Sequence, residues 1–178
     1  MLTHERILFD TSVYGKLIGE FPIEAKSFHL HSTLRKRFIV YSCNVIRAEL
    51  RRAPQLPTPT GADLRRSLLH LHDTIVRNQF SIDKEVDALA IAYFKRAKDI
   101  GSVKVQSWDS MQNDLSILAC ATLQRLDVVF TNDLRTMLGR YVVSAVREVN
   151  QARGLTSPSL LPYEDLKLIL QKELFAVP

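Results

Sequence analysis

The sequence contains few cysteines and no long hydrophobic segment. Its two cysteines, Cys43 and Cys120, form no C-x-x-C spacing, which argues against a zinc site or a redox motif and favours buried free thiols. No apolar run approaches the roughly 18 residues of a membrane span. The N-terminus shows no basic segment followed by an apolar stretch, so we expect no signal peptide, no membrane partner and a cytoplasmic location.

The histidines form no metal-binding pattern. His29 and His31 flank one leucine, and His70 and His72 flank another. Residues spaced two apart do not share a helix face. We therefore expect these side chains to be surface or packing residues rather than metal ligands.

The composition is that of a globular protein, with 46% hydrophobic and 24% charged residues. At 178 residues the chain is long enough for one domain with a full-sized core, and we expect that domain to span residues 1–178. The formal charge of +5 at pH 7 is compatible with phosphate binding, although basic proteins often bind no phosphate.

Short apolar runs alternate with stretches of helical spacing along the chain. The runs predict strands at residues 6–9, 38–41, 128–130 and 160–161, with a brief extended piece at 80–82. The helical spacings predict helices at residues 13–20, 22–37, 45–53, 62–79, 84–100, 110–125, 134–151 and 163–174. This alternation favours an α/β fold with a parallel sheet and helices on both faces.

Two of the predicted strands are followed closely by aspartates. Asp10 follows the apolar run at 6–9, and Asp133 follows the run at 128–130 after Thr131 and Asn132. In open α/β sheets, ligands bind at the carboxyl ends of the strands. Each aspartate alone also fits a simpler structural role: Asp10 an Asx turn, and Asp133 the N-cap of the next helix.

Two further acids border the apolar faces of predicted helices. Glu49 lies four residues after Val45, and Asp114 lies three after Met111 in the first two turns of its helix. A buried carboxylate needs a partner. For Glu49, the simpler alternative is a salt bridge with Arg47 or Arg52.

These four acids fall at strand ends or in the helical turns next to the same edge of the predicted sheet. Carboxylates that converge repel one another unless cations join them. Hard divalent ions such as Mg²⁺ and Mn²⁺ prefer oxygen ligands. Two such ions activate a water and stabilise the leaving oxygen in phosphodiester hydrolysis.

Four segments taken in order resemble the PIN-domain family. They are Ile7-Leu8-Phe9-Asp10-Thr11-Ser12-Val13-Tyr14, Val45-Ile46-Arg47-Ala48-Glu49-Leu50, Asn113-Asp114-Leu115-Ser116-Ile117-Leu118-Ala119-Cys120-Ala121 and Val129-Phe130-Thr131-Asn132-Asp133. The resemblance covers roughly residues 6–135. It implies a three-layer α/β/α sandwich with a Rossmann-like central parallel sheet of about five strands.

The resemblance also implies an activity and its site. It implies an endoribonuclease that depends on Mg²⁺ or Mn²⁺ and acts on RNA, as in the VapC toxins of toxin–antitoxin pairs, with an antitoxin partner and a homodimer. The family's acidic positions, which are catalytic and hold the metal, fall on four residues of this chain: Asp10, Glu49, Asp114 and Asp133. Its hydroxyl positions fall on Ser12 and Thr131, which would orient carboxylates or a water.

The chain is longer than the smallest toxins of that family. We expect a helical insertion at about 54–107 and a helical C-terminal extension at about 134–178. These regions would build a different substrate groove or a dimer surface.

Basic side chains near the acidic edge would contact the phosphates of the substrate, and Arg47, Arg51 and Arg135 are the best placed. The cluster Arg35-Lys36-Arg37 ends a predicted helix, where it either complements the helix dipole or contacts nucleic acid.

Three alternatives to the toxin remain. One is an RNA-processing nuclease, and another is a non-catalytic module of the same fold that binds RNA or protein. The third is a phosphatase resembling the haloacid dehalogenases. That class needs a second aspartate two residues after the strand-end one, where this chain has Ser12.

Overall fold

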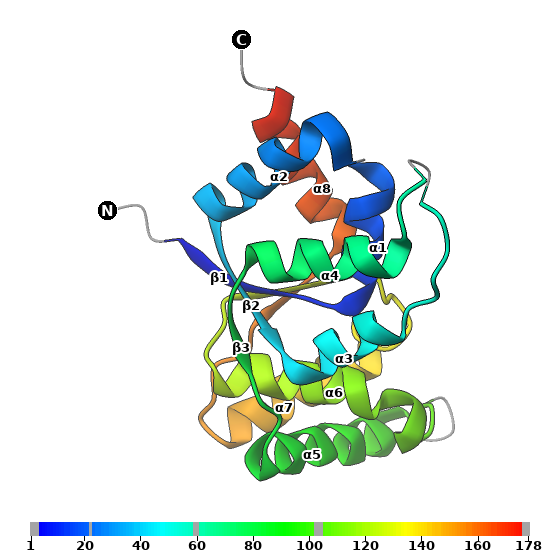
Figure 1. The fold of residues 1–178 in the computed structure, drawn as a ribbon. Coiled ribbons are helices and arrows are strands. Elements are labelled where there is room, and N and C mark those ends of the chain that lie inside the picture. The colour runs from blue at the N-terminus through cyan, green and yellow to red at the C-terminus, as the bar shows by residue number, and fades with distance from the viewer. Residues whose placement is uncertain (1–3, 22, 59–60, 102–104, 176–178) are drawn as a thin grey trace.

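The fold is built around a five-stranded parallel sheet (Figure 1). The computed structural model describes residues 4–21, 23–58, 61–101 and 105–175. The strands are β1 (Glu5–Phe9), β2 (Phe38–Cys43), β3 (Val76–Phe80), β4 (Val128–Thr131) and β5 (Ser159–Pro162). They lie in the order β3-β2-β1-β4-β5, and each neighbouring pair is parallel. All five carboxyl ends therefore lie at one edge of the sheet.

Helices cover both faces of this sheet, which confirms the predicted three-layer sandwich. They are α1 (Thr11–Glu20), α2 (Ile23–Arg37), α3 (Asn44–Arg52), α4 (Leu64–Ile75), α5 (Lys84–Gly101), α6 (Trp108–Leu123), α7 (Arg140–Ala152) and α8 (Tyr163–Phe175). Figure 1 shows α1, α2, α4 and α8 on one face, and α5, α6 and α7 on the other. Residues 7–9 of the central strand β1 are apolar and buried, because a parallel strand between two helical layers is covered on both faces.

The helix α6 is buried along most of its length. Every residue from Leu115 to Thr122 is buried, because the helix lies between the sheet and α5 (Figure 1). The preceding turns of α6 carry Asn113 and Asp114 toward the carboxyl edge of the sheet. The packing of α6 thus fixes the position of one predicted site residue.

The edge strand β3 differs from the sequence prediction. The predicted helix at 62–79 ends at Ile75, and residues 76–80 form β3, so the extended piece expected at 80–82 is misplaced. The middle of β3 is exposed, as is usual at a sheet edge, so it lacks the apolar run that would mark a strand. The region 54–107 is therefore not a purely helical insertion, because it supplies one strand of the sheet.

The chain after β4 also differs from the prediction. The helix expected from residue 134 begins only at Arg140, and residues 134–138 form turns. These turns fold back onto Gly139, where a Cβ atom would lie 2.3 Å from the carbonyl oxygen of Arg135. Only glycine permits that approach.

The predicted strand at 160–161 is confirmed as the core of β5, which pairs with β4. The region 134–178 therefore contributes a strand as well as helices. The other predicted helices are confirmed with small shifts at their ends; α6, for example, begins at Trp108. Pro22, the expected start of α2, lies outside the described residues. In the part of the chain that is described, each helix is too short or too polar to cross a bilayer.

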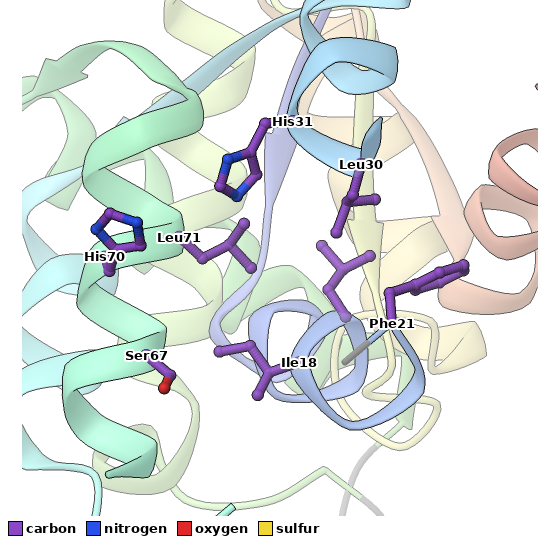
Figure 2. A pocket seen from close by; sticks show the side chains of 8 residues that line it. Ile18, Phe21, Leu30, His31, Ser67, His70 and Leu71 are labelled. Carbon is purple, nitrogen blue, oxygen red and sulfur yellow. The ribbon is translucent and has the colours of Figure 1, made fainter. Parts of the chain in front are cut away.

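The cysteines are buried, whereas the histidines of the two His-Leu-His pairs differ: His72 is buried, His31 is half-buried and His70 is exposed. Cys43 and Cys120 are buried and free, as predicted. The rings of His31 and His70 lie with centroids 6.3 Å apart beside a small, mainly apolar hollow between α1, α2 and α4 (Figure 2). The hollow measures about 30 Å³, which is room for only about two water molecules. The side chain of His29 lies outside the described residues.

Two buried tyrosines provide a test of this core. The hydroxyl of Tyr93 donates to Asn150 Oδ1 at 2.6 Å and lies 3.0 Å from Thr122 Oγ1. Among the described residues, the hydroxyl of Tyr14 has no hydrogen-bond partner although it is fully buried. Tyr93→Phe should lower the free energy of unfolding by about 1–3 kcal/mol, whereas Tyr14→Phe should leave it unchanged or raise it. Urea unfolding of both variants measures the two changes in the free energy of unfolding. An equal decrease in both would contradict the view that the Tyr93 hydroxyl is hydrogen-bonded and the Tyr14 hydroxyl is not.

Candidate active site

Asp10 stands directly after β1 and is held in place by four donors. It is the N-cap of α1, where its side chain accepts from Thr11 N at 2.7 Å and from Ser12 N at 3.4 Å. Its Oδ2 also accepts from Ser12 Oγ at 2.6 Å and from Thr131 Oγ1 at 3.0 Å. The simple reading of Asp10 as a turn residue is thus correct in part, because the same carboxylate caps a helix and joins two strand ends.

The two hydroxyls that bind Asp10 also accept hydrogen bonds from the chain after β4. Ser12 Oγ accepts from Asn132 N at 3.0 Å, and Thr131 Oγ1 accepts from Asp133 N at 2.9 Å. Each hydroxyl therefore links the Asp10 carboxylate to a backbone N–H of the β4 end. This is the orienting geometry that the sequence predicts for Ser12 and Thr131.

Glu49 extends from α3 and is held from both sides of the site. It accepts from Thr11 Oγ1 and, at 2.6 Å, from Asn113 Nδ2. The alternative of a salt bridge to Arg47 is wrong, because Arg47 forms a bidentate ion pair with Asp73, with contacts of 2.8 and 3.0 Å. Glu49 therefore connects the residue after Asp10 to the residue before Asp114.

Asp114 is half-buried on α6 and is strongly perturbed. Burial, together with the negative charges of Asp10, Asp133 and Glu49, raises the pKa of this carboxyl to about 8. A hydrogen bond to Asp133 also favours the protonated form. The helix dipole, which we expect to favour the ionised form, is outweighed by burial and by three neighbouring acids.

Asp133 serves two structural purposes at the edge of this acidic cluster. Its Oδ1 accepts from Arg135 N and Thr136 N, each at 2.9 Å, and so caps the turn that precedes α7. Its carboxyl group is also the hydrogen-bond partner of Asp114. The predicted capping role is confirmed in kind, although the capped segment is a turn rather than the helix.

The four acids are therefore electrostatically coupled, as the sequence predicts, but they do not form a finished metal cage. Within residues 4–21, 23–58, 61–101 and 105–175, no three histidine, cysteine, aspartate or glutamate side chains converge as a metal site. Glu49 is directed to its own hydrogen-bond donors, and Asp114 is directed to Asp133. The candidate ligands are all carboxylate oxygens, but the hydrogen bonds of Glu49 and Asp114 direct these two side chains to other partners.

The three arginines predicted to contact substrate have different surroundings. Arg47 is occupied by Asp73, whose pKa falls to about 2 because of the guanidinium hydrogen bonds. Arg51 and Arg135 are exposed. Arg135 follows Asp133 closely in the turn beside the acidic edge. Arg51 lies two residues after Glu49 on α3, a spacing at which the two side chains leave different faces of the helix.

Sequence reasoning assigned no role to two residues that position the acids. Thr11 and Asn113 hold Glu49, yet only the hydroxyls of Ser12 and Thr131 were predicted to orient carboxylates. Their signal in the sequence is adjacency, since each is next to a predicted acid and carries a hydrogen-bond donor.

A second polar constellation, Ser42, His72 and Asp73, is structural. His72 Nε2 lies 2.9 Å from Ser42 Oγ, and His72 Nδ1 lies 2.8 Å from Asp73 Oδ1. This is the chemical order of a hydrolase triad. Ser42 has no exposed surface, however, so a substrate carbonyl has no route to it. The network instead satisfies polar groups buried beneath α4.

The raised pKa of Asp114 predicts a pH-dependent stability. The folded protein keeps this proton up to about pH 8, whereas the unfolded chain releases it near the ordinary value of 3.8. The stability contributed by protonated Asp114 is therefore complete below about pH 4 and is lost as the pH rises toward about 8. Asp114→Asn removes this titration. The unfolding temperature of the variant should therefore rise relative to that of the parent as the pH increases across that range.

Thermal unfolding in EDTA measures this gain, and EDTA keeps metal ions out of the comparison. Asp109→Asn, the same substitution at an exposed position of the same helix, is the control. A pH-independent difference for Asp114→Asn would mean that the acids do not interact as described.

Comparisons with known proteins extend to the fold only. No protein-family model matches the chain, and no curated protein matches it by sequence. A solved structure with a similar fold is that of FitAB bound to an IR36 DNA fragment, with a TM-score of 0.54 and 17% sequence identity. That match covers 88% of this chain and 94% of the other.

VapBC2 from Rickettsia felis, bound to a DNA fragment from its promoter, also matches. Its TM-score is 0.49 with 10% identity, over 88% of this chain and 98% of the other. At such identities the likeness is one of architecture, and it assigns no residue. The five-stranded parallel sheet with helices on both faces is the α/β architecture that this chain shares with the FitAB structure.

Proposed function

We propose that this protein is a metal-dependent endoribonuclease that acts in the cytoplasm and hydrolyses RNA phosphodiester bonds. The observation that supports the proposal best is the coupling of Asp10, Glu49, Asp114 and Asp133, which adds to burial in raising the pKa of Asp114 to about 8. Carboxylates gathered at the ligand-binding edge of a parallel sheet repel one another, which disfavours their ionised forms. A bound cation would relieve that repulsion.

The donor chemistry fits a hard divalent cation. All four candidate ligands are carboxylates, and both cysteines are buried free thiols. Mg²⁺ or Mn²⁺, when bound, would activate the attacking water and stabilise the leaving oxygen. Asp10, Glu49 and Asp114 are the proposed ligands, with Asp133 supporting a second ion or an outer water.

The protein's own residues prepare the site for this chemistry. Ser12 and Thr131 fix the Asp10 carboxylate by hydrogen bonds, which limits its rotation. Thr11 and Asn113 fix Glu49 in the same way. Arg135, exposed beside this edge, and the exposed Arg51 would contact substrate phosphates. Arg47 is a poorer candidate because it would first have to leave Asp73.

The resemblance to VapC toxins extends the proposal to a biological role. The chain would be the toxin of a toxin–antitoxin pair, would bind an antitoxin protein and would form a homodimer. The fold shared with the FitAB structure is compatible with that role. An RNA-processing nuclease of the same fold would have the same chemistry, and an antitoxin-sized reading frame beside the gene would separate the two.

The nuclease proposal predicts the effect of one conservative substitution. Asp10→Asn should lower Mn²⁺-dependent RNA cleavage by more than about 100-fold, because loss of an outer-shell partner alone typically costs 10–100-fold. Asparagine is as good an N-cap as aspartate, so α1 should remain intact. Cleavage of a labelled structured RNA, followed on denaturing gels, measures the loss.

Asp109→Asn again serves as the matched control, since it removes an exposed carboxylate from the same protein without touching the cluster. Equal cleavage by parent and Asp10→Asn, with both variants folded, would refute the catalytic assignment.

A non-catalytic RNA- or protein-binding module is the second candidate. The observation in its favour is that the described acids are not assembled as a three-ligand site. The two candidates differ in metal affinity, so Mn²⁺ titration by calorimetry discriminates them. The nuclease should bind Mn²⁺ with an affinity that falls in Asp10→Asn and not in Asp109→Asn. An absence of Mn²⁺ binding to the parent would favour the binding module.

A further inference from the structure

A hollow of about 430 Å³ lies at the amino-terminal edge of the sheet, opposite the acidic cluster. It opens where α2 leads into β2 and α4 leads into β3, on the left side of Figure 1. His4, Arg35 and Arg77 line it, and none of the described residues in its lining carries a carboxylate side chain. The size falls within the range of about 300–1,000 Å³ typical of small-ligand sites.

A break in the sheet places one of these arginines. Val40 of β2 pairs with Val76, but the next residue, Tyr41, pairs with Asn78. Arg77 is therefore the extra residue of a β-bulge. Bulges redirect a side chain away from the regular alternation of a strand and are frequent beside functional sites. Val40, Val76 and Arg77 all line the hollow, so the bulge lies in its wall.

The second arginine belongs to the basic end of α2. Arg35, Lys36 and Arg37 are all exposed in the last turn of this helix, but only Arg35 lines the hollow. Complementing the helix dipole would account for all three alike. The helix dipole does not explain why Arg35 lines the same hollow as Arg77 and His4, which come from different parts of the chain.

We propose that this hollow is a second site, separate from the acidic cluster, that binds the phosphate groups of a nucleotide or of a nucleic-acid strand. Two guanidinium groups supply planar, paired donors that match phosphate oxygens, and an imidazole adds a further donor. The neighbouring Val40 and Val76 supply an apolar wall.

The test compares two double variants that change the net charge equally. Arg35→Gln with Arg77→Gln removes the lining guanidiniums, whereas Lys36→Gln with Arg37→Gln removes two exposed charges nearby that do not line the hollow. Binding is measured in EDTA, by calorimetry with ADP and by fluorescence anisotropy with a labelled single-stranded RNA. Because EDTA excludes metal chemistry, the result does not depend on the proposed nuclease activity.

The lining variant should lose about tenfold or more in affinity relative to the control variant, since each lost contact is a charge-assisted hydrogen bond. For RNA, the slope of log affinity against log salt should also fall by about 1.4. Loss of ADP binding would identify a nucleotide site, and loss confined to RNA would identify a path for the strand.

An equal loss of affinity in both double variants would mean that the ligand is attracted only by the overall positive charge, and it would overturn the proposal. So would a parent protein that binds neither probe, or a lining variant that binds as the parent does. Each single substitution is measured as well, so that a folding defect in the double variant leaves the comparison intact.

Discussion

The carboxylate of Asp10 is the interaction on which the rest of the site depends. Its Oδ2 accepts from two hydroxyls, and each hydroxyl accepts a backbone N–H from the chain that leaves β4. The ends of β1 and β4 are thereby joined through a single charged group. Because those strands are adjacent and parallel, the joint sets where the turn after β4 lies and therefore where Asp133 stands. A neutral or apolar residue at this position would leave several donors unsatisfied at a buried strand end.

The same arrangement is electrostatically costly, and the cost falls on Asp114. Asp114 is half-buried among acids from the end of β1, from α3 and from the turn after β4, and burial together with these three charges raises its pKa to about 8. Without a cation, the cluster reduces its repulsion by keeping a proton on Asp114 and by holding Glu49 to Thr11 and Asn113. This accounts for two findings together: the acids are coupled, yet among the described residues no three of them form a closed cage. A purely structural scaffold has no need for such a cluster, which is why we favour a metal-dependent reaction.

The parallel sheet also separates charge along its own length. The carboxyl ends of the strands carry the acidic cluster, while the amino ends carry the hollow lined by His4, Arg35 and Arg77. Separation of this kind follows from topology, because every strand enters at one edge and leaves at the other. The proposed cation and the proposed phosphate ligand would then bind without competing for the same surface.

The sequence by itself determined the central sheet and the membership of the acidic cluster. Apolar runs ending in Asp10 and Asp133 mark strands buried on both faces, and such strands are parallel, so their carboxyl ends must meet. Only the tertiary structure decided which strand forms the edge beside β2 and which groups surround Glu49 and Asp114. The strand β3 has an exposed polar middle, and its pairing with β2 is a long-range contact that no local pattern records. Likewise, the proton on Asp114 and the donors to Glu49 arise from groups distant in sequence, since burial and mutual repulsion exist only once the chain has folded.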